Sequence, residues 1–284
     1  MIPNNNFSIL PFYKSIDEQN ARKWWVYGRV YPLYTPAGFM PTWQVYTEQS
    51  NYLLYLAVIN DNTGAVVKTI YPADLATYGI TRDYFGTMMV LSYPAIIPIL
   101  NSMENGRYYI RMYMDEYDLF SDIFTVVNDI QPYLKLEWWD DQDFVMDAGV
   151  IAYDGTFKNL LYLDSDIAKP EYVFEEEGES RNGYFYPVKM ISEKRYRFNF
   201  LAPEYLLDVL RFVRMSDHVR ITKNGQEYSV DTFLITPEWE ANGDVAVVAA
   251  EFETATVAKK IGLGYVRALR GDFNDDFNDD FNNQ

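Results

Sequence analysis

Two acidic clusters accompany aromatic residues in the second half of the chain, and paired carboxylates are the residues most able to do chemistry here. The first cluster follows the pair Trp138-Trp139 and the second follows Phe174; their members are Asp140, Asp141 and Asp143, then Glu175, Glu176, Glu177 and Glu179. A glycoside hydrolase requires one carboxyl as acid and another as base or nucleophile beside a bound sugar. Such groups could also bind Ca²⁺, although no spacing here matches a known calcium loop. The alternative is two solvated turns in an acidic protein, which we favour because no catalytic motif surrounds them.

The other residues with chemical potential are few. His218 is the single histidine, and no neighbouring Ser, Cys or metal-spaced carboxylate would make it a catalytic base, so we expect a structural role. Gly262-Leu263-Gly264 is too short for a nucleotide-binding loop. The absence of cysteine excludes disulfides, thiolate metal sites and cysteine nucleophiles. The sequence therefore predicts no enzyme, no catalytic residue, no metal and no cofactor.

Adjacent aromatic residues suggest binding surfaces. Trp24-Trp25, Trp138-Trp139 and Tyr184-Phe185-Tyr186 each place neighbouring rings on opposite faces if the segment is a strand. One ring of each pair is then expected in a core and the other in solvent. Exposed rings would bind a protein neighbour or a sugar; burial of both faces within a sandwich is the alternative.

The C-terminal residues 271–284 repeat an Asp-Phe-Asn motif three times. The repeat places aromatic and acidic residues at a spacing of four, namely Phe273, Phe277, Phe281, Asp272, Asp276 and Asp280. Asn and Asp are poor helix residues, so this segment is not expected to be stable alone. It could dock on a neighbouring subunit, with Phe as anchors and Asp setting the charge complementarity. A solvated acidic tail is the alternative, and the sequence leaves both open.

Composition excludes several classes of function. A net charge of −17, from 24 Lys and Arg against 41 Asp and Glu, argues against binding nucleic acid or anionic membranes. No apolar run reaches the roughly 18 residues of a membrane span. The N-terminus has no basic start followed by an apolar stretch, so no secretory signal is expected. The 25 Tyr, 18 Phe and 6 Trp instead suit half-buried strands and wet protein interfaces.

Residues 1–130 are expected to form an antiparallel β-sandwich of immunoglobulin-like size. Strand-like segments recur between turns, at residues 22–34, 52–59, 65–71, 88–93, 107–114 and 120–127. Within 107–114 the side chains alternate, with Tyr109, Arg111 and Tyr113 on one face. The turn-forming residues 60–64 predict a hairpin. No Cys-Trp-Cys pattern indicates a true immunoglobulin domain.

Residues 131–265 are expected to form a second β-rich domain, sandwich-like or barrel-like, with one helix at about 203–215. The expected strands are 133–139, 150–153, 160–164, 171–174, 193–201, 219–221, 227–230, 233–235 and 244–254. Within 193–201 the side chains alternate, with Tyr196, Phe198 and Phe200 on one face and Arg195, Arg197 and Asn199 on the other. Asn224-Gly225 predicts a two-residue hairpin turn. The apolar stripe of the helix is Leu206, Leu207, Leu210 and Val213. Residues 266–284 form the acidic tail.

Several segments resemble a group of uncharacterised virion structural proteins encoded by bacteriophages and prophages of anaerobic gut bacteria. They are residues 7–13 (FSILPFY), 174–179 (FEEEGE), 193–198 (EKRYRF) and 233–237 (FLITP), together with the Asp-Phe-Asn tail. The order of elements in the second domain is also similar to the single-helix β modules of tail tubes and distal-tail rings. The fold-level part of this likeness says little about function by itself.

The resemblance implies a tail-region component that forms a symmetric ring. It would be synthesised in the host cytoplasm and would bind copies of itself and other virion proteins, without enzymatic activity. The alternative function is a carbohydrate-binding or adhesion protein for a host-surface glycan, with Trp138 and Trp139, or Trp24 and Trp25, as a stacking platform. A glycan-cleaving enzyme using the acidic clusters is the third and least supported reading.

Overall fold

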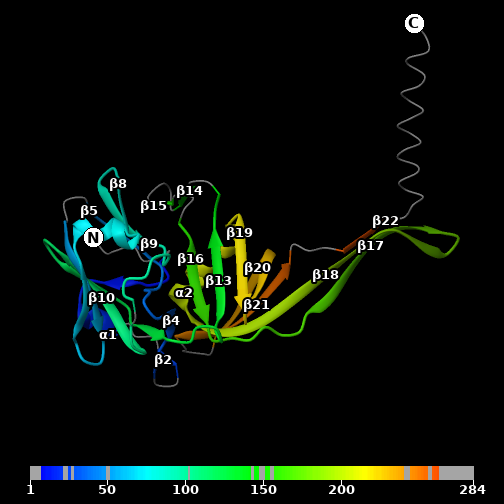
Figure 1. Ribbon diagram of the computed structural model, residues 1–284. Coiled ribbons are helices and arrows are strands. Elements are labelled where there is room, and N and C mark those ends of the chain that lie inside the picture. Colours follow the sequence, from blue (N-terminus) through cyan, green and yellow to red (C-terminus); the bar gives the residue numbers. More distant parts are fainter. Residues whose placement is uncertain are drawn as a thin grey trace, which may run out of the picture.

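The fold is mainly β, as the sequence predicts (Figure 1). A computed structural model describes residues 8–21, 25–26, 29–48, 52–101, 103–141, 144–146, 151–153, 157–239, 244–254 and 258–261. The helical elements are short: α1 (Ile16–Ala21), α2 (Glu204–Leu210) and the 3₁₀ helices η1 (Pro72–Tyr78) and η3 (Val213–Met215). None of the helices in these ranges combines the length and the hydropathy needed to cross a bilayer.

One large sheet runs through both halves of the molecule. Its hydrogen-bonded order is β1-β11-β10-β12-β4-β16-β13-β19-β20-β21-β18-β17, with β6 and β7 attached at β10, and β22 attached at β18. The strands from the first half are β1 (Phe12–Tyr13), β4 (Leu33–Pro36), β6 (Leu53–Asn60), β7 (Val66–Ile70), β10 (Gly106–Met114), β11 (Asp118–Ser121) and β12 (Phe124–Val127). Those from the second half are β13 (Leu134–Trp139), β16 (Asn159–Leu163), β17 (Glu171–Arg181), β18 (Tyr184–Pro203), β19 (His218–Lys223), β20 (Gln226–Trp239), β21 (Val245–Thr254) and β22 (Ala258–Ile261).

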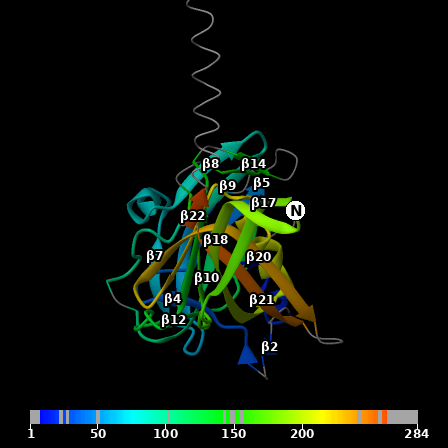
Figure 2. The same ribbon diagram turned by 90° about the vertical axis from the view of Figure 1, so that its right-hand side faces the viewer.

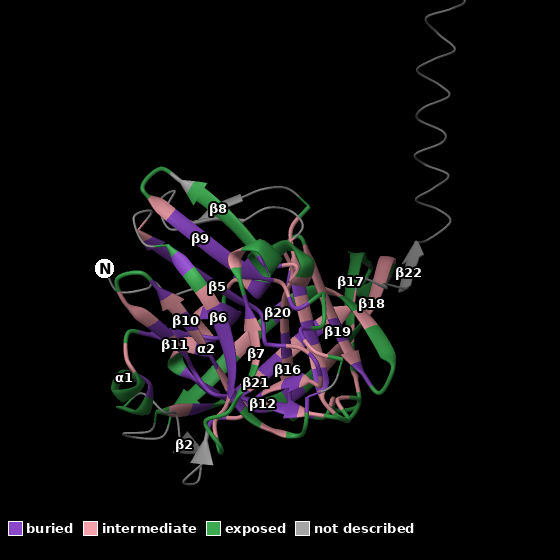
Figure 3. Cartoon of the chain, turned by 60° about the vertical axis from the view of Figure 1, so that its left-hand side comes forward, coloured by how far each residue is buried: buried purple, intermediate pink, exposed green. Residues whose placement is uncertain are grey.

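The first half is a β-sandwich, which confirms the expected architecture. A second sheet, β5-β9-β8, faces the large one and contains β5 (Trp43–Glu48), β8 (Thr81–Phe85) and β9 (Met88–Tyr93). Trp43 is fully buried between the sheets. Its ring meets Phe12 of the large sheet edge-on at 5.7 Å and stacks with Tyr93 of its own sheet at 6.2 Å. Figure 3 shows β6 and β9 buried along most of their length, so the two inner faces form the core.

Strand alternation in this half follows the sequence pattern. Tyr108, Ile110, Met112 and Met114 of β10 are buried, whereas Tyr109, Arg111 and Tyr113 face outward and are only partly covered. The turn at residues 60–64 joins β6 to β7 as an antiparallel hairpin. Two short antiparallel pairs complete the list of strands: β2 (Trp25–Val26) with β3 (Arg29–Val30), and β14 (Phe144–Met146) with β15 (Ile151–Tyr153).

The two halves meet at β4, where the structure corrects the expected all-antiparallel pairing. β4 pairs in parallel with β12, from Leu33↔Phe124 to Pro36↔Val127, and its Tyr34 also pairs with Tyr162 of β16. A parallel pair requires a long crossover, and the sandwich strands between β4 and β12 supply it. Buried side chains of both halves form one contiguous cluster. The division at residue 130 stays a prediction, and the sheet continues across it.

The helix of the second half is shorter than expected. α2 begins at Glu204, after Pro203 in extended conformation (φ −72°, ψ 161°), and ends at Leu210; the 3₁₀ turn η3 occupies the rest of the predicted range. Leu206, Leu210 and Val213 of the predicted stripe are buried, and Val209 takes the place expected for the half-buried Leu207.

Hairpins dominate the rest of this half. Asn224 and Gly225 have φ values of 52° and 78°, so they form the predicted two-residue turn between β19 and β20. The strands expected at 227–230 and 233–235 are one strand, β20, interrupted by a bulge between Val230 and Thr232. In β18, Phe198 and Phe200 are buried while Arg197 and Asn199 are exposed, which confirms the predicted alternation.

Candidate functional site: a projecting hairpin and a tyrosine-lined pocket

The end of β13 and the start of β19 bring Asp140, Asp141 and His218 close together. The Asp217 amide donates to Asp140 Oδ1 at 2.9 Å, and the Asp141 amide donates to Asp217 Oδ2 at 3.1 Å. His218 Nε2 lies 2.7 Å from Asp141 Oδ1. These contacts fasten the end of β13 to the start of β19. Partial burial raises the pKa of Asp140 above its usual value, and the neighbouring Asp217 carboxylate adds to this.

The second acidic cluster has a different location from the one predicted. Glu175, Glu176, Glu177 and Glu179 are consecutive parts of strand β17 rather than a turn, and all are exposed. Glu177 pairs with Lys189 of β18 at 3.1 Å. Over the described ranges, no three His, Asp or Glu side chains are grouped so that they could hold a metal ion. Asp143 lies outside the described residues.

The tryptophan pair on β13 is not a stacking platform. Trp138 is 2% exposed, while Trp139 on the opposite face is half-buried, so the two rings cannot form one exposed row. The Trp139 ring stacks with His218 at 5.1 Å, and Lys158 Nζ lies 4.3 Å from its centroid. This is the predicted division of one ring inside and one outside. It removes the sugar-platform interpretation for Trp138 and Trp139.

The remaining interaction candidates lie beyond what the structure describes. Trp24 and the side chain of Trp25 belong to this group, as do all of the tail candidates: Phe273, Phe277, Phe281, Asp272, Asp276 and Asp280. Gly262 and Gly264 lie there too.

A long hairpin, here called the arm (residues 171–194), projects from the second half (Figures 1 and 2). Its strands β17 and β18 turn at Asn182 and Gly183, whose φ values of 52° and 81° allow a two-residue turn. β21 pairs with β18 only from Arg195 to Pro203, and β22 covers only Lys189–Ser192. No described arm side chain is buried. The arm is therefore a sheet extension with both faces exposed.

One face of the arm is aromatic. Tyr172 pairs with Lys194 and Phe174 with Ser192, which places both rings on the face that continues into the buried Phe198 of the body. The two rings are 61% and 62% exposed. At the tip, Tyr184 and Phe185 are 70% and 50% exposed, so neither of these rings enters a core as the sequence predicted.

The opposite face of the arm mixes charged and apolar side chains, with Glu177 against Lys189 and Glu175 against Ile191. The face of Tyr172 and Phe174 also carries Glu176 and Lys194, and its two rings remain largely exposed. β17 is also the last strand in the sheet order, so its outer backbone groups have no strand partner among the described strands.

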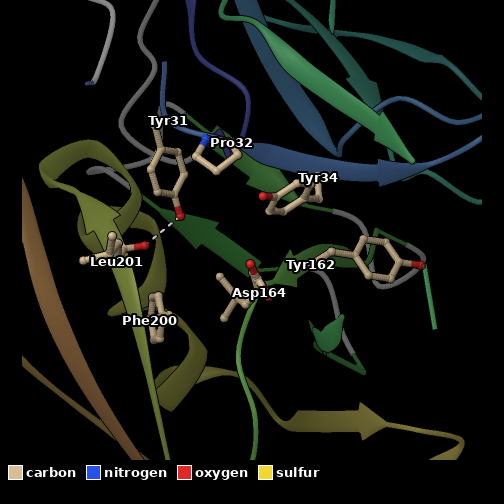
Figure 4. A pocket seen from close by; sticks show the side chains of 8 residues that line it. Tyr31, Pro32, Tyr34, Tyr162, Asp164, Phe200 and Leu201 are labelled. Atoms are coloured by element: carbon tan, nitrogen blue, oxygen red, sulfur yellow. Dashed lines mark hydrogen bonds between the residues drawn. The ribbon is translucent and has the colours of Figure 1, made fainter. Parts of the chain in front are cut away.

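The second feature is a pocket between β4, β16 and β18, here called the tyrosine pocket (Figure 4). Its volume is about 200 Å³, and it is lined by Tyr31, Pro32, Tyr34, Tyr162, Leu163, Asp164, Phe200 and Leu201. The Tyr31 hydroxyl donates to the Leu201 carbonyl at 2.8 Å. The Tyr34 ring contacts Tyr133 at a centroid distance of 4.4 Å. Both halves of the chain thus contribute walls.

Burial governs the ionisation of the tyrosines around this pocket. It raises the pKa of Tyr34 to about 12, with added repulsion from Tyr133 and the Asp164 carboxylate. It likewise raises the pKa of Tyr162 to about 12, with a smaller effect from Glu137. The pKa of the buried Tyr31 is raised further, mainly by burial. All three hydroxyls are therefore neutral at physiological pH.

Alkaline pH is expected to destabilise the fold between about pH 10 and pH 12. The folded chain holds the Tyr34 and Tyr162 protons more tightly than the unfolded chain, whose tyrosines titrate near 10. Their contribution is therefore complete below about pH 10 and is lost as the pH rises through about 12. For Tyr162 the loss cannot exceed about 1.4 kcal/mol per pH unit, because a single proton is released, and solvent screening of the partly buried ring lowers it further.

Denaturant unfolding across this interval measures the effect. Tyr162→Phe should lose less stability between the two pH values than the parent protein. Tyr84→Phe, at an exposed ring on β8, should behave as the parent does. An equal loss in Tyr162→Phe and in the parent would contradict the assignment.

The sequence analysis singled out arm residues, namely the glutamates within 175–179 and the aromatic residues 184–186, but it did not predict the projecting hairpin or the tyrosine pocket. Asn182-Gly183 was the available signal for the arm, because such a dipeptide between strand patterns marks a hairpin. The pocket had no comparable local signal, since Tyr31 and Asp164 lie in different halves of the chain.

Comparisons with known proteins add no functional assignment. No protein-family model matches the chain, and no curated protein matches it. Among solved structures, it is similar to a chain from "Crystal structure of Dpr2 Ig1-Ig2 in complex with DIP-Theta Ig1-Ig3", with 7% identity and a TM-score of 0.17 over 80% of this chain and 88% of that one. A chain from "Crystal structure of DIP-gamma IG1+IG2" has 9% identity and a TM-score of 0.15, over 48% and 84%. TM-scores this low carry no argument.

Proposed function

We propose that this protein is a virion structural subunit of the tail region, which assembles into a ring with copies of itself by means of the arm. The observation that supports this most is the uncovered aromatic face of Tyr172 and Phe174 on a hairpin that projects from the body. The sequence resemblance to phage structural proteins supports the virion context. In this proposal the protein acts without catalysis, cofactor or metal, and its partners are its own copies and other virion proteins.

Two features of the isolated arm are unfavourable in free energy, and docking on a neighbouring subunit would remove both. A hairpin without a packed face is marginally stable in water, and large exposed rings are costly to keep hydrated. A neighbouring subunit that covered the Tyr172 and Phe174 face would bury this apolar area. It could also pair with the outer edge of β17. Aromatic side chains of this kind commonly supply most of the affinity at protein interfaces.

The other end of the large sheet offers a complementary apolar surface. Exposed side chains on and beside β6 and β7 include Tyr52, Leu54, Val66 and Tyr71. Because β6 and β7 join the sheet at β10 and β17 ends it at the far side, these two surfaces lie at opposite ends. An arm that docks on this surface of the next copy makes a head-to-tail contact, which closes into a ring when the rotation per subunit allows it.

The test is the mass of the full-length protein in solution, measured by light scattering over a range of concentrations. The parent should form a defined oligomer. Tyr172→Ser/Phe174→Ser should weaken self-association at least about tenfold, as expected for the loss of two aromatic anchors. Tyr84→Ser/Ile96→Ser, which removes two other large exposed side chains from the first half, should leave the mass distribution unchanged.

Two results would contradict the proposal. One is a parent protein that stays monomeric at every concentration, and the other is an arm variant with the same oligomer distribution as the parent. Circular dichroism of each variant separates lost assembly from lost folding. Mass spectrometry of purified phage particles tests the virion context separately.

A further inference from the structure

The interior of the tyrosine pocket combines buried aromatic rings with one carboxylate. Tyr31, Phe200 and Leu163 form its buried part, each less than a tenth exposed. Tyr34 and Tyr162 are partly exposed, and Asp164 is exposed, so these three stand nearer the solvent. Figure 4 shows Asp164 lying between Tyr34 of β4 and Phe200 of β18.

The hydroxyls of Tyr31 and Tyr34 already have hydrogen-bond partners, whereas the Asp164 carboxylate has no ion-pair partner among the described residues. The Tyr31 hydroxyl bonds to the Leu201 carbonyl, and the Tyr34 hydroxyl is in hydrogen-bond contact with Tyr133. Within the ranges that the structure describes, no Lys, Arg or His makes an ion pair with Asp164. Lys223 of β19 instead forms an ion pair with Asp166, with its Nζ 2.7 Å from Asp166 Oδ1. What remains for a ligand is therefore ring surface and one negative charge.

We propose that the tyrosine pocket binds a single organic cation, a guanidinium or alkylammonium group, between its aromatic rings and the Asp164 carboxylate. The negative faces of aromatic rings attract such cations, and an ion-pairing oxygen beside them fixes the orientation. The volume of about 200 Å³ accommodates one such group with a short chain. A lone carboxylate supplies too few oxygen ligands for Ca²⁺ or Mg²⁺.

This chemistry discriminates against neutral and anionic molecules. A neutral polar group would have to lose water without gaining an ion pair, and an anion would be repelled by Asp164 and by the net charge of −17. The same cation could come from a free amine or from a Lys or Arg side chain of another protein. The proposal does not depend on the assembly function, because the pocket lies in the body and shares no residue with the arm.

The experiment is a calorimetric titration of the full-length protein with Nα-acetyl-arginine amide and, as a near-isosteric neutral control, Nα-acetyl-citrulline amide (called arginine amide and citrulline amide below). Arginine amide should bind and citrulline amide should not. Binding should weaken with added NaCl, as for an ion pair near the surface. Asp164→Asn should weaken arginine amide binding at least about tenfold. Asp83→Asn, which neutralises an exposed carboxylate on β8, should have no effect.

A second titration, with the capped peptide acetyl-Gly-Gly-Arg-Gly-Gly amide, identifies the source of the cation. If the peptide binds at least as tightly as arginine amide, a protein side chain is the natural ligand; if only the amide binds, the ligand is a small amine. Equal binding of arginine and citrulline amides, no binding of either, or unchanged binding to Asp164→Asn would each overturn the proposal. The comparison of the two amides on the parent protein needs no variant, so it remains decisive if Asp164→Asn folds poorly.

Discussion

Phe198→Ala is expected to lower the free energy of unfolding by about 3–5 kcal/mol, which is the range for truncating a fully buried Phe. Phe198 lies on β18 at the centre of an aromatic cluster and is 2% exposed. Its ring is 5.8 Å from Phe200, 6.2 Å from Phe252 and 6.4 Å from Phe233. These neighbours come from three strands, so they can close only part of the cavity that alanine leaves.

Chemical denaturation monitored by fluorescence or circular dichroism gives the value directly. Phe198→Leu keeps most of the volume and should cost less than about half as much. The difference in unfolding free energy between Phe198→Ala and Phe198→Leu reports how tightly the cluster is packed. A loss below about 1 kcal/mol for Phe198→Ala would show that this cluster is not the structural core of the second half.

Lys223→Met is expected to cost about 3 kcal/mol, because it removes a largely buried charged donor from two backbone carbonyls. Lys223 is 9% exposed and ends β19. Its Nζ donates to the Pro132 carbonyl at 2.5 Å and to the Ser165 carbonyl at 2.6 Å, and it pairs with Asp166 at 2.7 Å. Methionine has a similar length and fills the space, but it leaves both carbonyls without that donor.

The matched control is Lys135→Met, at a lysine that pairs with Glu137 near the surface at 2.8 Å. Surface pairs of this kind contribute at most about 1 kcal/mol, so this variant should stay close to the parent. Thermal and denaturant unfolding should agree on the ranking. Equal effects from the two lysines would mean that solvent, rather than the buried ammonium, satisfies the two carbonyls.

Lys223 also shows why the halves of this chain behave as one structure. Pro132 belongs to the connection between them, Ser165 follows β16, and Lys223 ends β19. One side chain therefore fixes the connection to two elements of the second half. The β4–β16 pairing adds a backbone contact between the first half and the second, at the tyrosine pocket.

Local patterns in the sequence determined much of the secondary structure. Alternation in β10 and in β18 identified the buried face of each strand, because successive side chains of a strand point to opposite sides. Asn224-Gly225 specified its turn, because both residues tolerate positive φ. The helix was located within a few residues by Pro203 and the leucine stripe. Each of these signals depends only on neighbouring residues.

The tertiary structure alone decided what each face meets. Alternation shows that Tyr172 and Phe174 share a face, but not that β21 stops pairing at Arg195 and leaves that face uncovered. The tyrosine pocket likewise exists because Tyr34 of β4 pairs with Tyr162 of β16, a contact between residues in different halves. Local propensity carries no information on such long-range pairings, because they depend on which distant strands pack against one another in the folded chain. The sequence by itself therefore determined the β-rich fold and its strand faces, and the tertiary structure decided where the arm and the pocket are.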